Sequence, residues 1–291
     1  WLLKSCMLMN ICGINNLNTN YRYPQTKINF CGIKRSESDS FERSGQLINM
    51  KMFNPFTMKF VKSEQRIDLK NSGVYKMEDP EDKSHPLILD YDPSRTGSLK
   101  DRRTGSRIAV NILKTTCPYY ENQVAYHFMS KDLKKEYGYV QLHRPVMDEL
   151  SSESELLRDY PEYGVVGDRV IVSYLQNWDD NNVGGVGKLA DKMGVQFCID
   201  NGIEPNIVSY ADYDSHVAHY KRGKRFIPPG KGSYEAEFFK YTYGKEDPNE
   251  ILQEQIQDAK WHGTDVDLTG WGYLIMYMPK DLANEYYKQL T

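Results

Sequence analysis

The sequence predicts an α+β protein in which a mixed β-sheet with flanking helices follows an extended N-terminal arm. Short segments with alternating apolar side chains predict the strands, helical spacing and cap residues predict the helices, and a polar stretch without a sustained period predicts the arm. The 291 residues are 40% apolar and 26% charged, which excludes a collagen or a fully disordered chain. We divide them into an arm (1–50), an α+β part (51–160) and an α/β-like part (161–291); residues 51–291 would also fit one domain.

The arm is predicted from its composition. Residues 13–50 are rich in Asn, Ser, Thr and Gln, and runs such as residues 36–40 (Ser-Glu-Ser-Asp-Ser) bury too little apolar area to offset the chain entropy lost on folding. We therefore expect this segment to be loose, or to lie on a partner or on the body of the protein.

Short strands dominate the predicted elements of the N-terminal part. Residues 56–60 alternate, residues 87–89 form a buried strand, and residues 107–113 place Ile108, Val110 and Ile112 on one face. Pro118 is expected to open a helix over residues 119–128, because proline suits the first helical position. Ser130 is expected to cap a short helix, and residues 137–142 read as a strand.

The C-terminal part begins after an acidic segment, residues 151–164, which is the best internal boundary. Consecutive β-branched side chains predict a strand over residues 169–175. A helix over residues 188–201, ended by Gly202, and a strand over residues 206–210 would complete a strand–helix–strand unit, which favours a parallel pair. The remaining predictions are strands at 233–243 and 272–278 and helices at 248–260 and 280–290.

Composition also limits the class of protein. With 37 basic and 40 acidic residues, the net charge of −3 excludes a generic polyanion binder. The apolar runs are far shorter than the roughly 20 residues of a membrane span, so none is expected. The five cysteines form no CxxC pair, which favours free thiols in a reducing, intracellular compartment.

Two local basic clusters stand out against that acidic average. One holds Arg102, Arg103 and Arg107; the other holds Lys221, Arg222, Lys224 and Arg225, flanked by aromatic residues. Such clusters suit a polyanion such as nucleic acid, and the alternative is that they are solvated loops paired with acidic neighbours. Together with the arm and 22 tyrosines, they favour a subunit of a larger assembly that binds protein partners and nucleic acid. The sequence leaves the cofactors unknown.

A glycine-rich segment, residues 184–187 (Gly-Gly-Val-Gly), lies between a predicted strand and a predicted helix. This position suits phosphate binding at a helix N-terminus. Its spacing matches neither GxxxxGK[ST] nor GxGxxG, and Asp179 and Asp180 just upstream would repel a phosphate. We interpret it as a flexible strand–helix turn.

A second function class is suggested by Glu235-Ala-Glu237, which is expected to open a strand after a Gly/Pro-rich loop. This pattern is similar to the catalytic end of ADP-ribosyltransferases. The resemblance implies that Glu237 orients the nicotinamide ribose and Glu235 the acceptor, with Arg144 at the end of an early strand and Ser173 in a degenerate Ser-Thr-Ser. The alternative function is therefore a transferase that uses these four residues.

A third function class rests on Asp212, His216 and His219. On a helix these three side chains share one face, and their oxygen and imidazole ligands suit Zn, Mn or Fe. The sequence thus also allows a metal-dependent hydrolase. The competing interpretation is a helix N-terminus with acidic residues at its positive end and two half-exposed histidines.

Overall fold

The computed structural model describes residues 46–54, 59–67, 70–77, 86–117, 120–144, 169–211, 215–230, 232–268, 270–271 and 274–290, within one compact unit, Arg43–Thr291. Residues 1–45 of the predicted arm and the predicted boundary at 151–164 lie outside the described residues. The last five residues assigned to the arm belong instead to strand β1 (Gln46–Asn54), which pairs with β2 (Lys59–Ile67) as an antiparallel hairpin.

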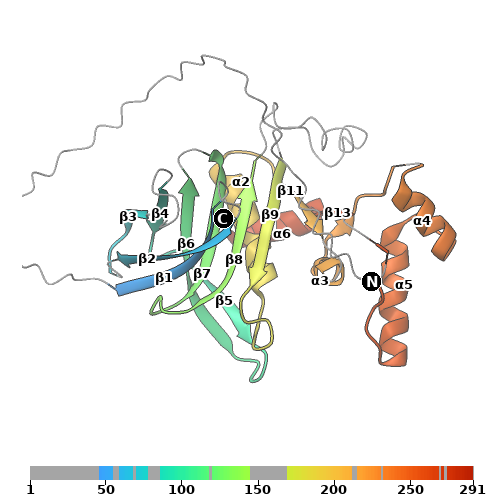
Figure 1. Ribbon diagram of the computed structural model, residues 1–291, viewed down its shortest axis with the longest axis horizontal. Coiled ribbons are helices and arrows are strands. Elements are labelled where there is room, and N and C mark those ends of the chain that lie inside the picture. Colours follow the sequence, from blue (N-terminus) through green and yellow to red (C-terminus); the bar gives the residue numbers. More distant parts are fainter. Residues whose placement is uncertain are drawn as a thin grey trace, which may run out of the picture. The chain divides into compact units, whose positions relative to one another are not determined.

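The predicted mixed sheet with flanking helices is confirmed (Figure 1). Parts 51–160 and 161–291 both contribute strands to it. Among the described strand pairs, β9 and β11 are parallel and the others antiparallel. The order across the sheet is β10 (Val183–Gly184), β5 (Thr96–Asp101), β6 (Arg107–Cys117), β7 (Tyr120–Ser130), β8 (Glu136–His143), β9 (Arg169–Asn177), β11 (Asn206–Ala211), β13 (Leu274–Tyr277) and β12 (Arg225–Phe226), with β4 (Leu87–Tyr91) and β3 (Gly73–Met77) joined through β6.

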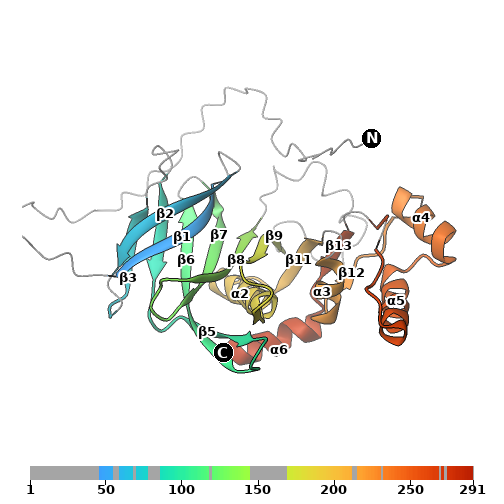
Figure 2. The same cartoon turned by 60° about the horizontal axis from the view of Figure 1, so that its bottom comes forward.

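The helices follow the second half of the chain: α2 (Val186–Asp200), α3 (Ser215–Lys221), α4 (Tyr234–Tyr243), α5 (Pro248–His262) and α6 (Lys280–Leu290). Helix α2 is the crossover between β9 and β11, as predicted, and α2 and α6 cover one face of the sheet (Figure 2). No helix in the described part of the chain is long and apolar enough to cross a membrane.

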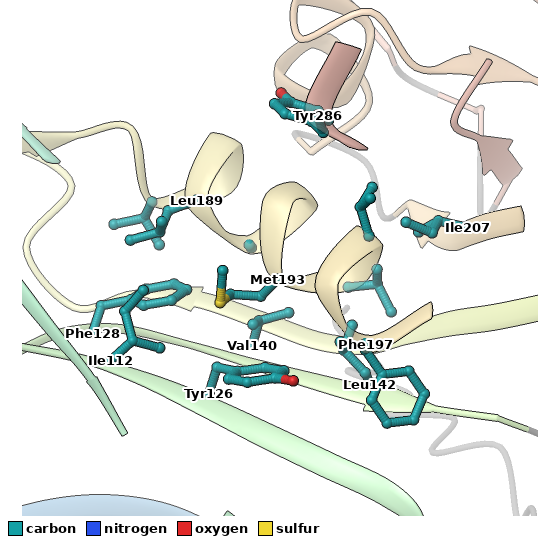
Figure 3. Close-up of a cluster of buried hydrophobic side chains, with 14 of the residues drawn as sticks. Ile112, Tyr126, Phe128, Val140, Leu142, Leu189, Met193, Phe197, Ile207 and Tyr286 are labelled. Carbon is teal, nitrogen blue, oxygen red and sulfur yellow. The ribbon is translucent and has the colours of Figure 1, made fainter. Parts of the chain in front are cut away.

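Three hydrophobic clusters hold these layers together. In the largest, Phe128 and Val140 of the sheet pack beneath Leu189 and Met193 of α2, and Tyr286 of α6 closes the far side of the helix (Figure 3). The second lies between the β1–β2 and β3–β4 hairpins and strands β6 and β7. The third joins α3, α4 and α5 to β12 and β13 around a buried Trp271. Burial of each such side chain contributes about 1.5–3 kcal/mol.

The predicted helix at residues 119–128 is wrong, because this segment is strand β7. Its side chains alternate: Val124, Tyr126 and Phe128 face α2, whereas His127 and Met129 face the other way. This period of two outweighs the helix-start signal of Pro118. The predicted short helix after Ser130 is also wrong, since these residues form the turn between β7 and β8.

The predicted strand at residues 233–243 is wrong as well, because this segment is helix α4. The Ser233 side chain caps the helix by accepting a hydrogen bond from the backbone N–H of Ala236 at 3.2 Å. Gly244 ends the helix with a φ of 68°, a conformation that glycine adopts without strain. Strands 169–175 and 206–210 and helices 188–201, 248–260 and 280–290 are confirmed.

Candidate anion-binding site

The parallel strands β9 and β11, which are neighbours inside the sheet, separate toward their carboxyl ends. Their ladder covers four residue pairs, from Arg169–Asn206 to Val172–Ser209, while β9 continues to Asn177. The register between β8 and β9 shifts at this point, so that Ser173 forms a bulge and is exposed. A bulge bends its strand, which accounts for the separation. Ligands of open α/β sheets bind in the crevice where parallel strands end and the connections diverge.

The N-terminus of α2 lies at the same end of these strands, because α2 follows the carboxyl end of β9. Its N-cap residue is Gly185, with a φ of 90° that favours glycine, and no side chain caps the helix. The first intrahelical bond runs from the Leu189 N–H to the Gly185 carbonyl, so the N–H groups before Leu189 have no acceptor within the helix. With no acidic side chain in its first turn, this helix end attracts anions.

Arg102 of the first basic cluster lies beside this helix end. Strand β10 pairs with β5, and the Arg102 N–H donates to the Asn182 carbonyl at 2.7 Å. A Cβ placed on Gly184 would lie 3.7 Å from the Arg102 Nε. Arg103 and Arg107 are exposed in the same hairpin. The predicted basic cluster and the glycine-rich turn are therefore neighbours.

Arg222 of the second basic cluster lies on the other side of the turn. A Cβ on Gly187 would come within 2.6 Å of the Arg222 Nη1, so glycine leaves the space that the guanidinium occupies. Arg222 Nε donates to Asp191 Oδ2 at 2.9 Å, and Nη2 donates to His219 Nδ1 at 2.7 Å. Because Asp191 is 1% exposed, this ion pair fixes the guanidinium beside the first turn of α2.

Two further members of the second cluster, Lys224 and Arg225, also bond to other groups of the protein. Lys224 is fully buried and donates to Asp191 Oδ1 at 2.9 Å and to Ser209 Oγ at 2.6 Å. Burial lowers the pKa of Lys224, and the Asp191 carboxylate opposes that shift. Arg225 donates to the Lys224 carbonyl and lies over the Tyr220 ring at 4.5 Å, which leaves Lys221 as the exposed member of the four.

Repulsion from Asp179 is reduced by its own partners. Lys135 Nζ donates to Asp179 Oδ2 at 2.6 Å, and Asn182 Nδ2 donates to Oδ1 at 2.6 Å. The hydrogen bond from Lys135, followed by the one from Asn182, lowers the pKa of Asp179. The negative charge of Asp179 is thus paired with a cation, which reduces the repulsion expected from Asp179, while Asp180 is exposed beside it.

The two histidines of the metal hypothesis are both hydrogen bonded to other groups of the protein. His216 is buried between Phe226 and Trp271 and donates through Nε2 to the Ala211 carbonyl at 3.0 Å. Burial, with the nearby Lys224 and Arg222 charges, lowers the pKa of His219 to about 2, so His219 stays neutral and accepts from Arg222. Asp212 lies outside the described residues, within which no three His, Cys, Asp or Glu side chains are grouped to hold a metal.

The transferase hypothesis places Glu235 and Glu237 at the start of a strand, but the structure places them in a helix. Glu235 and Glu237 lie in the first turn of α4, where a spacing of two residues points them to different sides of the helix. Arg144 follows β8, beside the amino-terminal end of β9, and its charge acts on the pKa of Cys198 near the end of α2. Ser173 alone of these four lies at the separation of β9 and β11.

A buried polar triad lies on the face of the sheet away from α2, and no motif in the sequence predicts it. His127 is hydrogen bonded through Nε2 to Thr115 Oγ1 at 3.0 Å and through Nδ1 to Glu136 Oε1 at 2.9 Å. A hydroxyl, imidazole and carboxylate in this order are also the parts of a nucleophilic triad. Because the Thr115 residue is 4% exposed and the His127 side chain is 0% exposed, we interpret the triad as a structural link between three strands.

Comparison of the sequence with protein-family models and with curated proteins finds no match. The functional argument therefore rests on the geometry of this site.

Proposed function

We propose that the protein is an acyltransferase that binds an acyl-coenzyme A where β9 and β11 separate. The observation that carries the proposal is the convergence of the uncapped α2 N-terminus, Arg102 and Arg222 at the carboxyl end of β9. Lys224 is buried against Asp191 and is not available to a ligand, so fewer cations of the second basic cluster face outward than nucleic acid would need; we therefore favour a smaller anionic ligand.

The phosphate end of the ligand would bind at the first turn of α2. Backbone N–H groups at residues 186–188 would donate to a pyrophosphate, and the two guanidiniums would pair with its oxygens from either side. Arg222 is already oriented by Asp191 and His219, so little side-chain entropy would be lost when the anion binds.

We expect the rest of the ligand to be an extended arm that contains amide groups and lies along β9 beyond the last pair with β11. Such a chain can pair with a strand through main-chain hydrogen bonds, and we expect it to pair with β9 beyond Val172, where the ladder to β11 ends. Coenzyme A combines both parts, a pyrophosphate and an extended amide-containing arm, and it carries acyl groups for transfer. The thioester would then lie near the bulge at Ser173.

The chemistry would be transfer of the acyl group to a nucleophilic acceptor, an amine or a hydroxyl. The acceptor atom bonds to the thioester carbonyl carbon, the carbon–sulfur bond breaks, and the thiolate takes up the proton that the acceptor loses. The protein's contribution is orientation of the two substrates and hydrogen bonding from a fixed backbone.

Calorimetric titration of the full chain tests the proposal with coenzyme A, ADP and pantetheine as separate ligands. We expect coenzyme A to bind more tightly than either fragment, since it would contact both the α2 N-terminus and strand β9. Arg102→Ala removes one charged contact and should weaken binding about tenfold. Lys260→Ala removes one exposed positive charge from α5 and serves as the matched control.

Two results would overturn the proposal. One is the absence of coenzyme A binding by the folded wild-type protein. The other is equal loss of affinity in Arg102→Ala and Lys260→Ala, which would show a general effect of charge. Release of free thiol from acetyl-coenzyme A with a panel of amines then tests the transfer step itself.

Assembly with a protein partner is a second proposal, and the exposed aromatic side chains of α4 and α5 favour it. Tyr234, Tyr241 and Trp261 are 77%, 94% and 86% exposed. Tyr and Trp are enriched at protein interfaces, where they supply much of the binding energy.

A further inference from the structure

Helices α4 and α5 follow each other in the chain, and both pack on the core around Trp271. We call residues 232–268, which contain them, the α4–α5 hairpin. Residues 232–268 contain nine carboxylates and three lysines, an excess of six negative charges in a chain whose net charge is −3. Two of the lysines are already paired: Lys245 bridges Glu250 and Glu254, and Lys240 lies 3.3 Å from Glu246. The hairpin is therefore the main negative region of the described sequence, while the rest of the chain carries a positive excess.

The exposed aromatic side chains lie within this acidic surface. On α4, Tyr234, Glu237 and Tyr241 share one side of the helix, because they are three and seven residues apart. Both tyrosines and Glu237 are exposed, whereas Ala236 and Phe239 of the same helix are buried, and Phe239 packs in the core around Trp271.

Helix α5 repeats the combination. Trp261 follows Glu254 and Asp258 at helical spacing, and all three side chains are exposed, while Ile251 and Leu252 are buried. Two interactions attract a cation to an aromatic ring beside a carboxylate: the cation–π interaction with the ring and the ion pair with the carboxylate. Guanidinium and ammonium groups are the cations that a protein partner offers.

We propose that the α4–α5 hairpin docks a basic polypeptide segment, with lysine or arginine side chains bound between the exposed aromatic rings and the carboxylates. Charge complementarity selects this occupant, because the excess of six negative charges would repel an acidic segment and would add nothing to the binding of a purely apolar one. The proposal concerns a surface outside the acyl-coenzyme A site and does not depend on that site.

Fluorescence anisotropy of a labelled lysine- and arginine-rich peptide of twelve residues, mixed with the full chain, tests this proposal without any cofactor. We expect binding that weakens as salt rises. The double variant Tyr241→Ala/Trp261→Ala should bind about tenfold more weakly, as expected for loss of interface aromatics. Tyr287→Ala, which truncates a 43% exposed tyrosine on α6, should bind as the wild type does.

Charge reversal separates a local site from general attraction. Glu237→Lys should weaken binding of the peptide more than Glu204→Lys, which makes the same change in net charge at an exposed position outside the hairpin. Equal effects of these two variants would overturn the proposal, as would equal binding of an acidic peptide of the same length. So would a concentration-dependent dimer that Tyr241→Ala/Trp261→Ala abolishes, since a second copy would then be the occupant.

Discussion

Replacing Asp191 by asparagine should destabilise the protein strongly, because this carboxylate neutralises two cations inside the molecule. Asp191 is 1% exposed and lies 2.9 Å from both Arg222 Nε and Lys224 Nζ. The Lys224 side chain is 0% exposed, so water cannot take the place of the lost charge. The Arg222 side chain is 19% exposed and can turn partly to solvent.

The expected magnitude follows from this difference between the two cations. Removing one member of a buried ion pair costs about 3–5 kcal/mol, because the other charge is left without compensation. The loss in the free energy of unfolding should be about 3 kcal/mol, since Arg222 regains hydration and asparagine still accepts a hydrogen bond. Urea unfolding at pH 7 of wild type and Asp191→Asn measures it. Asp258→Asn, which removes an exposed carboxylate on α5, should change stability by less than about 0.5 kcal/mol.

The pH dependence of Asp191→Asn gives a second, independent test. Burial already lowers the pKa of Lys224, and loss of the Asp191 carboxylate lowers this pKa further. Between that folded pKa and the ordinary value of 10.5, the unfolded state binds more protons than the folded state, so stability rises with pH. The deficit of the variant should therefore shrink as the pH rises from 7 toward 10.5. A loss below about 1 kcal/mol at pH 7, or a deficit that grows with pH, would refute the reasoning.

Three further predictions concern the same region and the third core. Gly187→Ala places a methyl group where the Arg222 guanidinium lies, and calorimetry should show weaker binding of coenzyme A in a protein that still folds. Wild-type stability should fall by about 2 kcal/mol between pH 6.5 and pH 4.5, since the unfolded state protonates its histidine while His219, with a pKa of about 2, stays neutral; urea unfolding of His219→Asn should show a smaller fall. Phe239→Ala removes a ring 4.9 Å from that of Trp271 and should cost about 3–5 kcal/mol, measured by thermal and urea unfolding.

Local patterns predicted the elements whose signals agree with one another. The strand–helix–strand unit of β9, α2 and β11 has β-branched strands and a glycine after the helix, and its parallel pairing follows from that order. Where the local patterns of a segment conflict, as in the segments that form β7 and α4, the sequence prediction was wrong. Pro118 opens a helix in many sequences, but the alternating side chains of β7 fill two different cores, and this tertiary demand decides its structure.

The candidate site was visible in the sequence as three separate features, whose meeting depends on long-range pairing. Arg102 reaches the glycine-rich turn because β10 pairs with β5, across 81 residues of sequence. Arg222 reaches it because Asp191, 31 residues earlier, binds its guanidinium. Neither pairing has a fixed spacing that a motif would record. The buried state of Lys224 was equally invisible, since its neighbours in the sequence are cations and glycine.

The departure of the glycine-rich turn from known phosphate motifs has a physical explanation in this arrangement. In a phosphate loop the glycines let the backbone itself surround the anion. Here Gly187 serves a different purpose, because the missing Cβ admits the Arg222 guanidinium from another part of the chain. If a helix N-terminus and arginines from other parts of the chain contact the anion together, fewer loop residues are needed at fixed positions than in a phosphate loop. The spacing of residues 184–187 is therefore evidence against a phosphate loop, and it is compatible with an anion held jointly by α2, Arg102 and Arg222.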